Sequence, residues 1–399
     1  MLDWPEITML SDIVSIYIYE MNNKKYIFLG DAHFNRSTGG CEEKYPIRCD
    51  DFNINTMTPE YYGTKCTSIG VLLHHWFIYN NDHNITTDFY LEVDFTEAQS
   101  RIDVNKLKTL QYDSNPYHDK SWMQLLSYVM EPCFIREKIN CPYYPNVRAH
   151  YADMRFIDFG FVGLVIDPFL FSPKKILIDD INELIVILYI LIYDYKNFID
   201  AIIQPDAFDE FIHQYTTRFS KLSRPLSLSY LQQIKNMEYI SVIRNGVRMH
   251  RTAAELLRLH NQSPDIAKLI KLYVYDLAKK YSDDIKADFK MDIPIFNSST
   301  NSRQLVELFR GYEEKLISLS TLSMDAYLLS RMFLQDSQEI ITFAGHFHIK
   351  HYVYFFEHYL QQQSVIKEDR RFGNKCINNI DLPKYLNANL YRQYVANKN

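Results

Sequence analysis

Alternating apolar and polar positions near the start of the chain predict two neighbouring strands. The segment 13–19 is rich in β-branched and aromatic residues, and 26–29 is a short apolar run. Asn22-Asn23 lies between them and is typical of a tight turn. We therefore expect a hairpin or two adjacent strands, the second of which ends at Gly30-Asp31-Ala32-His33.

Three further segments predict strands, and helical stretches separate them. The segments 89–95, 150–156 and 339–344 are short and rich in aromatic or β-branched residues. In contrast, 67–79 and 107–130 carry apolar residues at helical spacing. Strands that alternate with helices are typical of a layered α/β unit with a mainly parallel sheet.

The middle of the chain has a different pattern, in which strand signals are sparse. Apolar residues recur there with a period of 3.6, which predicts helices. The segments with this period are 181–203, 207–220, 228–243, 253–289 and 303–319. This part of the chain therefore predicts a helical insertion or cap.

We predict an α/β fold with a mixed or mainly parallel sheet flanked by helices and a large helical insertion. Residues 1–170 and 321–365 are expected to form the α/β domain, and 173–319 the insertion. A helix is expected to follow the strand 339–344. The segment 366–399 is polar and is expected to pack loosely as a tail.

Composition and charge narrow the class of protein. The chain has 399 residues, of which 47% are hydrophobic and 23% charged, and this balance is typical of a globular protein. The formal net charge of −6 argues against a dedicated nucleic-acid binder. The most apolar run, 184–193, is too short for a membrane span. The first residues lack the pattern of a secretory signal, so we expect a cytoplasmic protein.

The cysteines leave three alternatives open. Free thiols, disulfides and a structural metal all agree with their spacing, although no C-x-x-C pair is present. The cysteines are Cys41, Cys49, Cys66, Cys133, Cys141 and Cys376. We predict that Cys41 or Cys49 approaches a cysteine of another segment, such as Cys66 or Cys141, and braces the rim of the site described next.

Two predicted strands, one near each end of the chain, both end in Gly-x-x-His. The first motif is Gly30-Asp31-Ala32-His33, and the second is Gly345-His346-Phe347-His348. In open α/β sheets, ligands bind beyond the carboxyl ends of the strands. Neutral imidazole is both a general base and a common metal ligand. We therefore expect His33 and His348 to come together.

Two pairs of charged residues fit the same edge of the sheet. Glu92 and Asp94 lie two positions apart on one strand, so they share a face. Asp153 and Arg155 share a face in the same way. A buried acidic pair requires a cation, a metal or a proton, whereas at the edge of a sheet each pair would be a salt bridge or solvated.

Several histidines receive a lesser weight. His346 and His351 lie beside the second motif, and Asp31 lies within the first, so all three are further candidates. The neighbouring His74 and His75 are expected to be surface or core residues, because a histidine outside a motif more often has a structural role.

The order of these elements resembles a known clan. Gly-x-x-His, a strand carboxylate, a later arginine and a second Gly-x-x-His are similar to the erythromycin-esterase-like, TraB/TIKI and ChaN-like proteins. Members include hydrolases, metal-dependent proteases and a haem-binding lipoprotein. The resemblance implies His33 and His348 as the paired histidines, Glu92 as the carboxylate and Arg155 as the arginine. This chain departs at Asp31, where many members carry glutamate.

Two other resemblances were weighed. The phrases at 29–33, 141–143 and 150–155 are similar to uncharacterised proteins of large cytoplasmic DNA viruses, which implies a location in the host cytoplasm or the virion. The segments 31–33 and 345–348 also match the first and last motifs of calcineurin-like metallophosphoesterases. The central motifs of that family, Gly-Asp-x-x-Asp and Gly-Asn-His-Asp/Glu, are absent from the sequence.

These patterns favour a hydrolase that acts on a small molecule or a peptide, with a divalent metal such as zinc or manganese. His33, His348 and Glu92 would hold the ion and lower the pKa of a bound water. Arg155 would stabilise negative charge, and Asp31 or His346 would move protons. The alternatives are a viral structural or interaction protein that partners virion proteins, and a divergent metallophosphoesterase.

Overall fold

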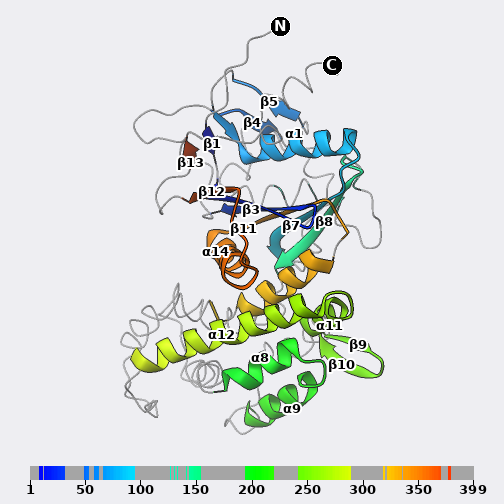
Figure 1. Cartoon of the computed structure of the whole chain (residues 1–399), viewed down its shortest axis with the longest axis vertical. Coiled ribbons are helices and arrows are strands. Elements are labelled where there is room, and N and C mark those ends of the chain that lie inside the picture. The colour runs from blue at the N-terminus through cyan, green and yellow to red at the C-terminus, as the bar shows by residue number, and fades with distance from the viewer. Residues whose placement is uncertain are drawn as a thin grey trace. The chain divides into compact units, whose positions relative to one another are not determined.

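The computed structural model divides the chain into two compact units (Figure 1). We call Met1–Asp153 with Gln335–Asn399 the sheet unit and Met154–Leu334 the helical unit. The structure describes residues 9–11, 13–31, 49–53, 58–62, 66–94, 126, 130, 133, 141, 143–153, 194–219, 241–288, 318–319, 321–334, 336–369 and 376–378.

A mixed six-stranded sheet forms the centre of the sheet unit, in the order β12-β2-β3-β11-β7-β8. The strands β3, β11, β7 and β8 run parallel, whereas β2 is antiparallel to β3 and β12 is antiparallel to β2. Their bounds are β2 Ser15–Met21, β3 Lys24–Asp31, β7 Thr87–Asp94, β8 Val147–Asp153, β11 Glu339–Gly345 and β12 Ile366–Asp369. The prediction of a mixed or mainly parallel α/β sheet is confirmed.

The strands β2 and β3 form the hairpin that the sequence predicts. Asn22 and Asn23 have φ angles of 53° and 61°. Asparagine tolerates this left-handed conformation better than most residues, and two such residues in a row match the right-handed twist of the strands they connect. The hairpin therefore follows from local chemistry alone.

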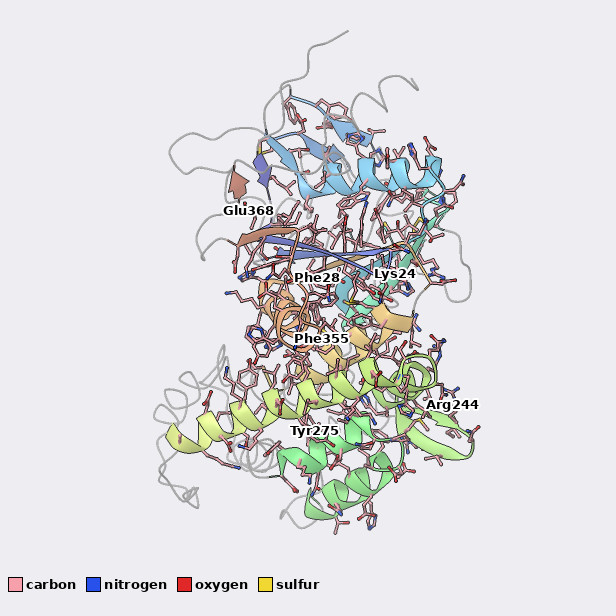
Figure 2. The ribbon with its side chains drawn as sticks, in the orientation of Figure 1. Lys24, Phe28, Arg244, Tyr275, Phe355 and Glu368 are labelled. Atoms are coloured by element: carbon pink, nitrogen blue, oxygen red, sulfur yellow. A yellow bond between two sulfur atoms is a disulfide. The ribbon has the colours of Figure 1, made fainter. Side chains whose placement is uncertain are left out.

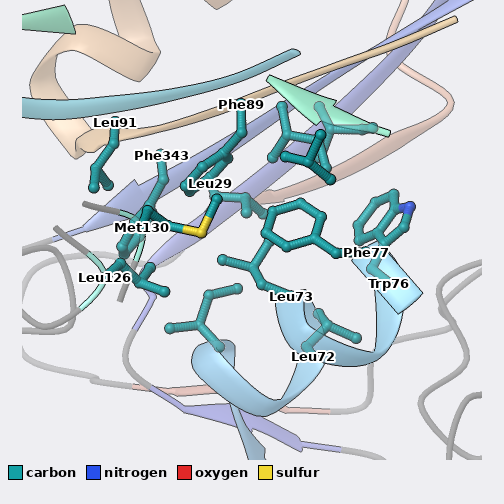
Figure 3. Packing of buried hydrophobic residues seen from close by; sticks show 14 of the residues in the cluster. Leu29, Leu72, Leu73, Trp76, Phe77, Phe89, Leu91, Leu126, Met130 and Phe343 are labelled. Atoms are coloured by element: carbon teal, nitrogen blue, oxygen red, sulfur yellow. The ribbon is translucent and has the colours of Figure 1, made fainter. Parts of the chain in front are cut away.

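Helices cover both faces of the sheet (Figure 1). On one face, α1 (Ile69–Asp82) packs Leu72, Leu73 and Phe77 into a core with Phe89 and Phe343 (Figure 3). The period-2 alternation of the strands directs these apolar side chains to the same face.

On the other face lie α14 (His346–Tyr354) and the π-helical turn η5 (Phe355–Tyr359). Aromatic rings fill this layer, with Phe28 and Phe356 in an edge-to-face pair at 5.1 Å between centroids. Tyr19 contacts both of these rings. Figure 2 marks Phe28 on the sheet and Phe355 on η5.

Smaller sheets complete this unit. A three-stranded sheet has the order β13-β1-β6, and β4 pairs with β5. The bounds are β1 Met9–Ser11, β4 Asp51–Asn53, β5 Thr58–Glu60, β6 Cys66–Ser68 and β13 Cys376–Asn378. The segment predicted to be a loosely packed tail thus contributes β12 and β13 to two sheets. The expectation of loose packing missed them because each strand is only four or three residues long.

The helical unit contains α8 (Tyr195–Ile203), α9 (Phe208–Phe219), α11 (Arg251–Gln262) and α12 (Pro264–Asp288). The helix predicted over 253–289 is interrupted at Ser263, because Pro264 starts a new helix at its favoured first position. Residues 321–334, which the sequence assigns to the α/β domain, belong to this unit. Tyr275 of α12, which is labelled in Figure 2, donates a hydrogen bond to Asp200 of α8.

One predicted helix is partly wrong. The segment 228–243 has helical periodicity, yet Ser241–Arg244 is the strand β9, which pairs with β10 (Val247–His250). The turn between them is Asn245-Gly246, with φ angles of 53° and 78°. Asn-Gly is a strong hairpin signal, and here it decides the local structure.

Within the described part of the chain, no helix has the length and apolar character that a bilayer crossing requires.

A buried carboxylate joins three elements at the amino end of β11. Glu339 Oε2 accepts hydrogen bonds from Trp76 Nε1 at 2.9 Å and Asn80 Nδ2 at 2.6 Å, both on α1. Its Oε1 lies 3.5 Å from Lys25 Nζ on β3. A buried charge needs such partners, so this cluster holds α1 against the sheet.

We expect Glu339→Gln to lower the free energy of unfolding by about 2 kcal/mol, because the neutral amide loses the charge beside Lys25 and turns an N–H donor toward that ammonium group. Trp76 is buried in the sheet unit, so tryptophan fluorescence during urea unfolding reports on that unit. Glu357→Gln is the control, since Glu357 is partly exposed and pairs with Lys367 at the surface. Equal stabilities of the two variants would contradict the role of Glu339.

Two disulfides are present among the described cysteines, Cys49–Cys66 and Cys133–Cys141. The first confirms that Cys49 approaches a cysteine of another segment, with a Cα separation of 4.5 Å. It anchors the chain before Asp50, whose backbone pairs with Thr67 of β6.

The bridge Cys49–Cys66 closes a loop with a sequence separation of 17. Loops of this length give a stabilisation of roughly 2–4 kcal/mol, mainly by restricting the unfolded chain. Cys66→Ser should lower the stability of the sheet unit by that amount in the oxidised protein. The same substitution should have a much smaller effect in a reductant that opens the bridge. A loss of equal size under both conditions would assign the effect to packing of Cys66 instead.

Candidate functional site

The carboxyl ends of the four parallel strands meet at one edge of the sheet. Asp31 ends β3 and pairs with Gly345, which ends β11. Asp94 and Asp153 end β7 and β8 and pair with one another. The two Gly-x-x-His motifs therefore leave neighbouring parallel strands. His33 and Arg155 lie outside the described residues, so the expected meeting of His33 with His348 stays a prediction.

A row of small residues crosses the sheet just before this edge. Ser15 pairs with Gly30 and also with Asp369, while Gly30 pairs with Ala344 on its other side. Leu91 pairs with Phe343, so the next residue, Glu92, lies beside Ala344. The row thus has three small residues in its centre and a carboxylate at each end.

Glu92 and His348 form a buried pair at one end of this row. His348 Nε2 lies 3.3 Å from Glu92 Oε1, and the two side chains are only 3% and 1% exposed. The backbone N–H of Gly345 donates to Glu92 Oε2 at 2.5 Å. Gly345 is the N-cap of α14, and the positive end of a helix dipole favours a negative charge there. Glu92 and His348, which the sequence analysis assigned to one metal site with His33, are therefore adjacent.

His346 stands over the other end of the row. Its Nδ1 is 2.8 Å from Ser15 Oγ, and its Nε2 is 3.3 Å from Asp369 Oδ1. Tyr17 donates to the second oxygen of Asp369 at 2.8 Å. Burial lowers the pKa of His346, although Asp369 acts in the opposite direction. The ring is therefore neutral near pH 7.

Gly30, the glycine of the first Gly-x-x-His motif, has a steric role. A Cβ atom on Gly30 would overlap Ser15 Oγ and lie 3.2 Å from His346 Nδ1. Any larger residue would push the first turn of α14 away from the sheet. Gly30 thus makes room for the contact between Ser15 and His346.

The sequence missed two residues of this arrangement, Ser15 and Asp369. Both are on strands, but no local motif marks them, and they meet His346 only through strand pairing. Asp31 and His351 are buried, and His351 packs its ring against Phe347 at 4.5 Å between centroids. The described residues therefore bring together Glu92 with His348, and His346 with Ser15 and Asp369.

Only some of the predicted metal ligands are among the residues that the structure describes. Among the residues that the structure describes, no group of three or more His, Cys, Asp or Glu is arranged to hold a metal ion. Of the predicted ligands, Glu92 and His348 are adjacent, and His33 is outside these residues. The metal therefore remains a prediction.

At the amino ends of the strands, Asp88 of β7 is a buried carboxylate that lies away from the candidate site. Asp88 accepts two hydrogen bonds from Arg148, at 2.9 and 2.7 Å, and lies 2.6 Å from His150 Nε2. Ser337 donates to it as well. Burial acts to raise the pKa of Asp88, but these partners outweigh it and hold the pKa at about 2. The cluster fastens β7, β8 and the start of β11 together.

On α1, His75 is a core residue and His74 is partly buried. His74 Nδ1 is 2.8 Å from the Tyr144 hydroxyl, and His75 Nε2 is 2.6 Å from that of Tyr61. Burial lowers the pKa of His74 to about 4 and that of His75 to about 3. Both rings are neutral in the folded protein.

This burial predicts a loss of stability in mild acid. In the unfolded chain both histidines have a pKa near 6.5, so they bind protons there before they do in the folded state. The free energy of unfolding should be highest above pH 6.5 and fall toward pH 4, on the order of 3 kcal/mol for His74 alone. Tryptophan fluorescence during urea unfolding at each pH measures it.

His74→Gln cannot be protonated and should show a shallower fall over that pH range. The matched control is His358→Gln, because His358 is exposed. If His74→Gln and the wild-type protein show the same slope, the burial of His74 does not set the acid sensitivity.

Comparison of the chain with protein-family models, with curated proteins and with solved structures gave no match.

Proposed function

We propose that the sheet unit is a hydrolase in which His348 and Glu92 form the general acid–base pair. The observation that carries this proposal is the buried imidazole–carboxylate contact of 3.3 Å at the carboxyl edge of a parallel sheet. In such sheets this edge is where ligands bind. Imidazole changes its protonation state near neutral pH, so it transfers protons under ordinary conditions.

The roles of the two residues follow from their partners. Glu92 is held by the Gly345 N–H at the start of α14, so it is a fixed carboxylate. A fixed carboxylate orients the imidazole and stabilises the imidazolium that forms when His348 takes a proton from water. The activated water attacks the substrate, and His348 returns the proton to the leaving group.

The same pair supports the metal-assisted form of the proposal. Imidazole nitrogen and carboxylate oxygen are the donor types that zinc accepts in hydrolases, and His33 would complete the set. A divalent ion at this position would lower the pKa of a bound water. Arg155 would stabilise the negative charge that develops on the substrate, as the resemblance to the esterase-like clan implies.

A hydrolysis assay on the full chain tests this proposal. We expect turnover of p-nitrophenyl acetate, with no turnover of bis(p-nitrophenyl) phosphate, which a metallophosphoesterase would cleave. His348→Gln and Glu92→Gln should each lower kcat by roughly 10²–10⁴-fold, which is the usual contribution of a positioned general base. Metal content of the same samples, with and without a chelator, separates the metal-assisted form from the metal-free form.

Glu357→Gln is the matched control, because it removes a carboxylate from the same unit away from the strand ends. Unchanged kcat in both His348→Gln and Glu92→Gln would exclude this pair as the catalytic group. Cleavage of the phosphodiester alone would favour the metallophosphoesterase alternative.

A further inference from the structure

The strongest unexplained feature is the chain of polar contacts that runs from Ser15 through His346 to Asp369. It resembles a catalytic Ser-His-Asp arrangement in composition, but Ser15 is 0% exposed and its Oγ is packed against Gly30. A single carbon atom added at Gly30 would already overlap Ser15 Oγ, so a substrate carbonyl cannot approach the oxygen from that side. The contacts therefore need another explanation.

The partners of the ring determine where its proton sits. An ionised aspartate only accepts hydrogen bonds, so Asp369 favours a proton on His346 Nε2. Nδ1 is then the acceptor, and the Ser15 hydroxyl donates to it across 2.8 Å. Both ring nitrogens of His346 have partners in the protein, so the ring is held in place from both sides.

Because His346 lies at the start of α14, its ring can influence the contacts that Glu92 makes. His346 is the first residue of α14 and directly follows Gly345, whose N–H holds Glu92. His348 belongs to the same first turn and faces Glu92. A ring that is held at both nitrogens fixes the junction between β11 and α14, on which both catalytic contacts depend.

We propose that Ser15 and Asp369 are positioning residues, which hold His346 as the neutral Nε2–H tautomer and thereby align Gly345 and His348 with Glu92. This inference rests on the proposed function, because it assigns the alignment of the same acid–base pair. Tyr17 completes the array, since its hydroxyl donates to Asp369 Oδ2 and fixes which oxygen faces the ring.

The substitution Asp369→Asn gives a result that a purely structural role does not predict. Tyr17 needs an acceptor, so it retains the amide oxygen and turns the amide nitrogen toward His346. That nitrogen is a donor, so His346 Nε2 becomes the acceptor and the proton moves to Nδ1. Asp369 is on an edge strand and its side chain is 33% exposed, so the variant is expected to fold.

Ring ¹⁵N NMR of the full chain, labelled at histidine and recorded near pH 7.5, measures both tautomers directly. We expect the Nε2–H form of His346 in the wild-type protein and the Nδ1–H form in Asp369→Asn. The His348 signals should shift in the same variant, because its alignment changes. His346→Gln and His348→Gln assign the signals.

Activity supplies a second readout. With p-nitrophenyl acetate, Asp369→Asn should lower kcat by about 10-fold to 100-fold and leave KM nearly unchanged, as loss of the outer partner of a functional histidine does. Asp283→Asn, at an exposed ion pair of the helical unit, is the control for both readouts.

The possible outcomes distinguish the His346 array, its positioning role and the proposed acid–base function. The Nδ1–H form in the wild-type protein, or no change of tautomer in Asp369→Asn, would overturn the array. A change at His346 with unaltered His348 signals would overturn its positioning role. If the signals of both histidines change but His348→Gln retains full hydrolysis, the array stands and the proposed acid–base function fails.

Discussion

The insertion of β11 between β3 and β7 is the interaction on which the rest of the structure depends. These strands come from opposite ends of the chain, and all seven residues of β11 are buried. Parallel pairing on both sides brings the two glycine motifs to one edge and Glu92 to the end of β11. Without this pairing, neither the amide of Gly345 nor His348 would meet Glu92.

Buried carboxylates at the amino ends of the strands have different partners from those at the carboxyl ends. At the amino ends of the strands, Asp88 and Glu339 accept hydrogen bonds from arginine, tryptophan, asparagine and serine, and Asp88 also contacts His150. At the carboxyl edge, Glu92 and Asp369 face histidines. A guanidinium stays charged at every ordinary pH, whereas an imidazole gains and loses its proton. A carboxylate paired with a guanidinium is suited to a structural role, whereas one paired with an imidazole is suited to proton transfer.

Close approach of a helix to the sheet explains the small residues of the central row. The side chains of Ser15, Gly30 and Ala344 leave space for the first turn of α14 on the strand ends. Because this turn lies close to the sheet, short side chains such as Ser15 and Asp369 reach the ring of His346. Steric room and polar contact are thus two consequences of the same arrangement.

Local sequence chemistry alone determined the strands and the Asn22-Asn23 hairpin, and it marked Glu92 and His348 as candidates, because alternation, turn residues and short motifs act between near neighbours. It also contained the Asn245-Gly246 hairpin signal, which helical periodicity obscured. Only the tertiary structure decided the strand order and, with it, the roles of Ser15 and Asp369. Ser15 meets His346 across 331 positions, and Asp369 reaches the same ring because β12 pairs with β2 from the other end of the chain. No local pattern specifies which distant strands will pair.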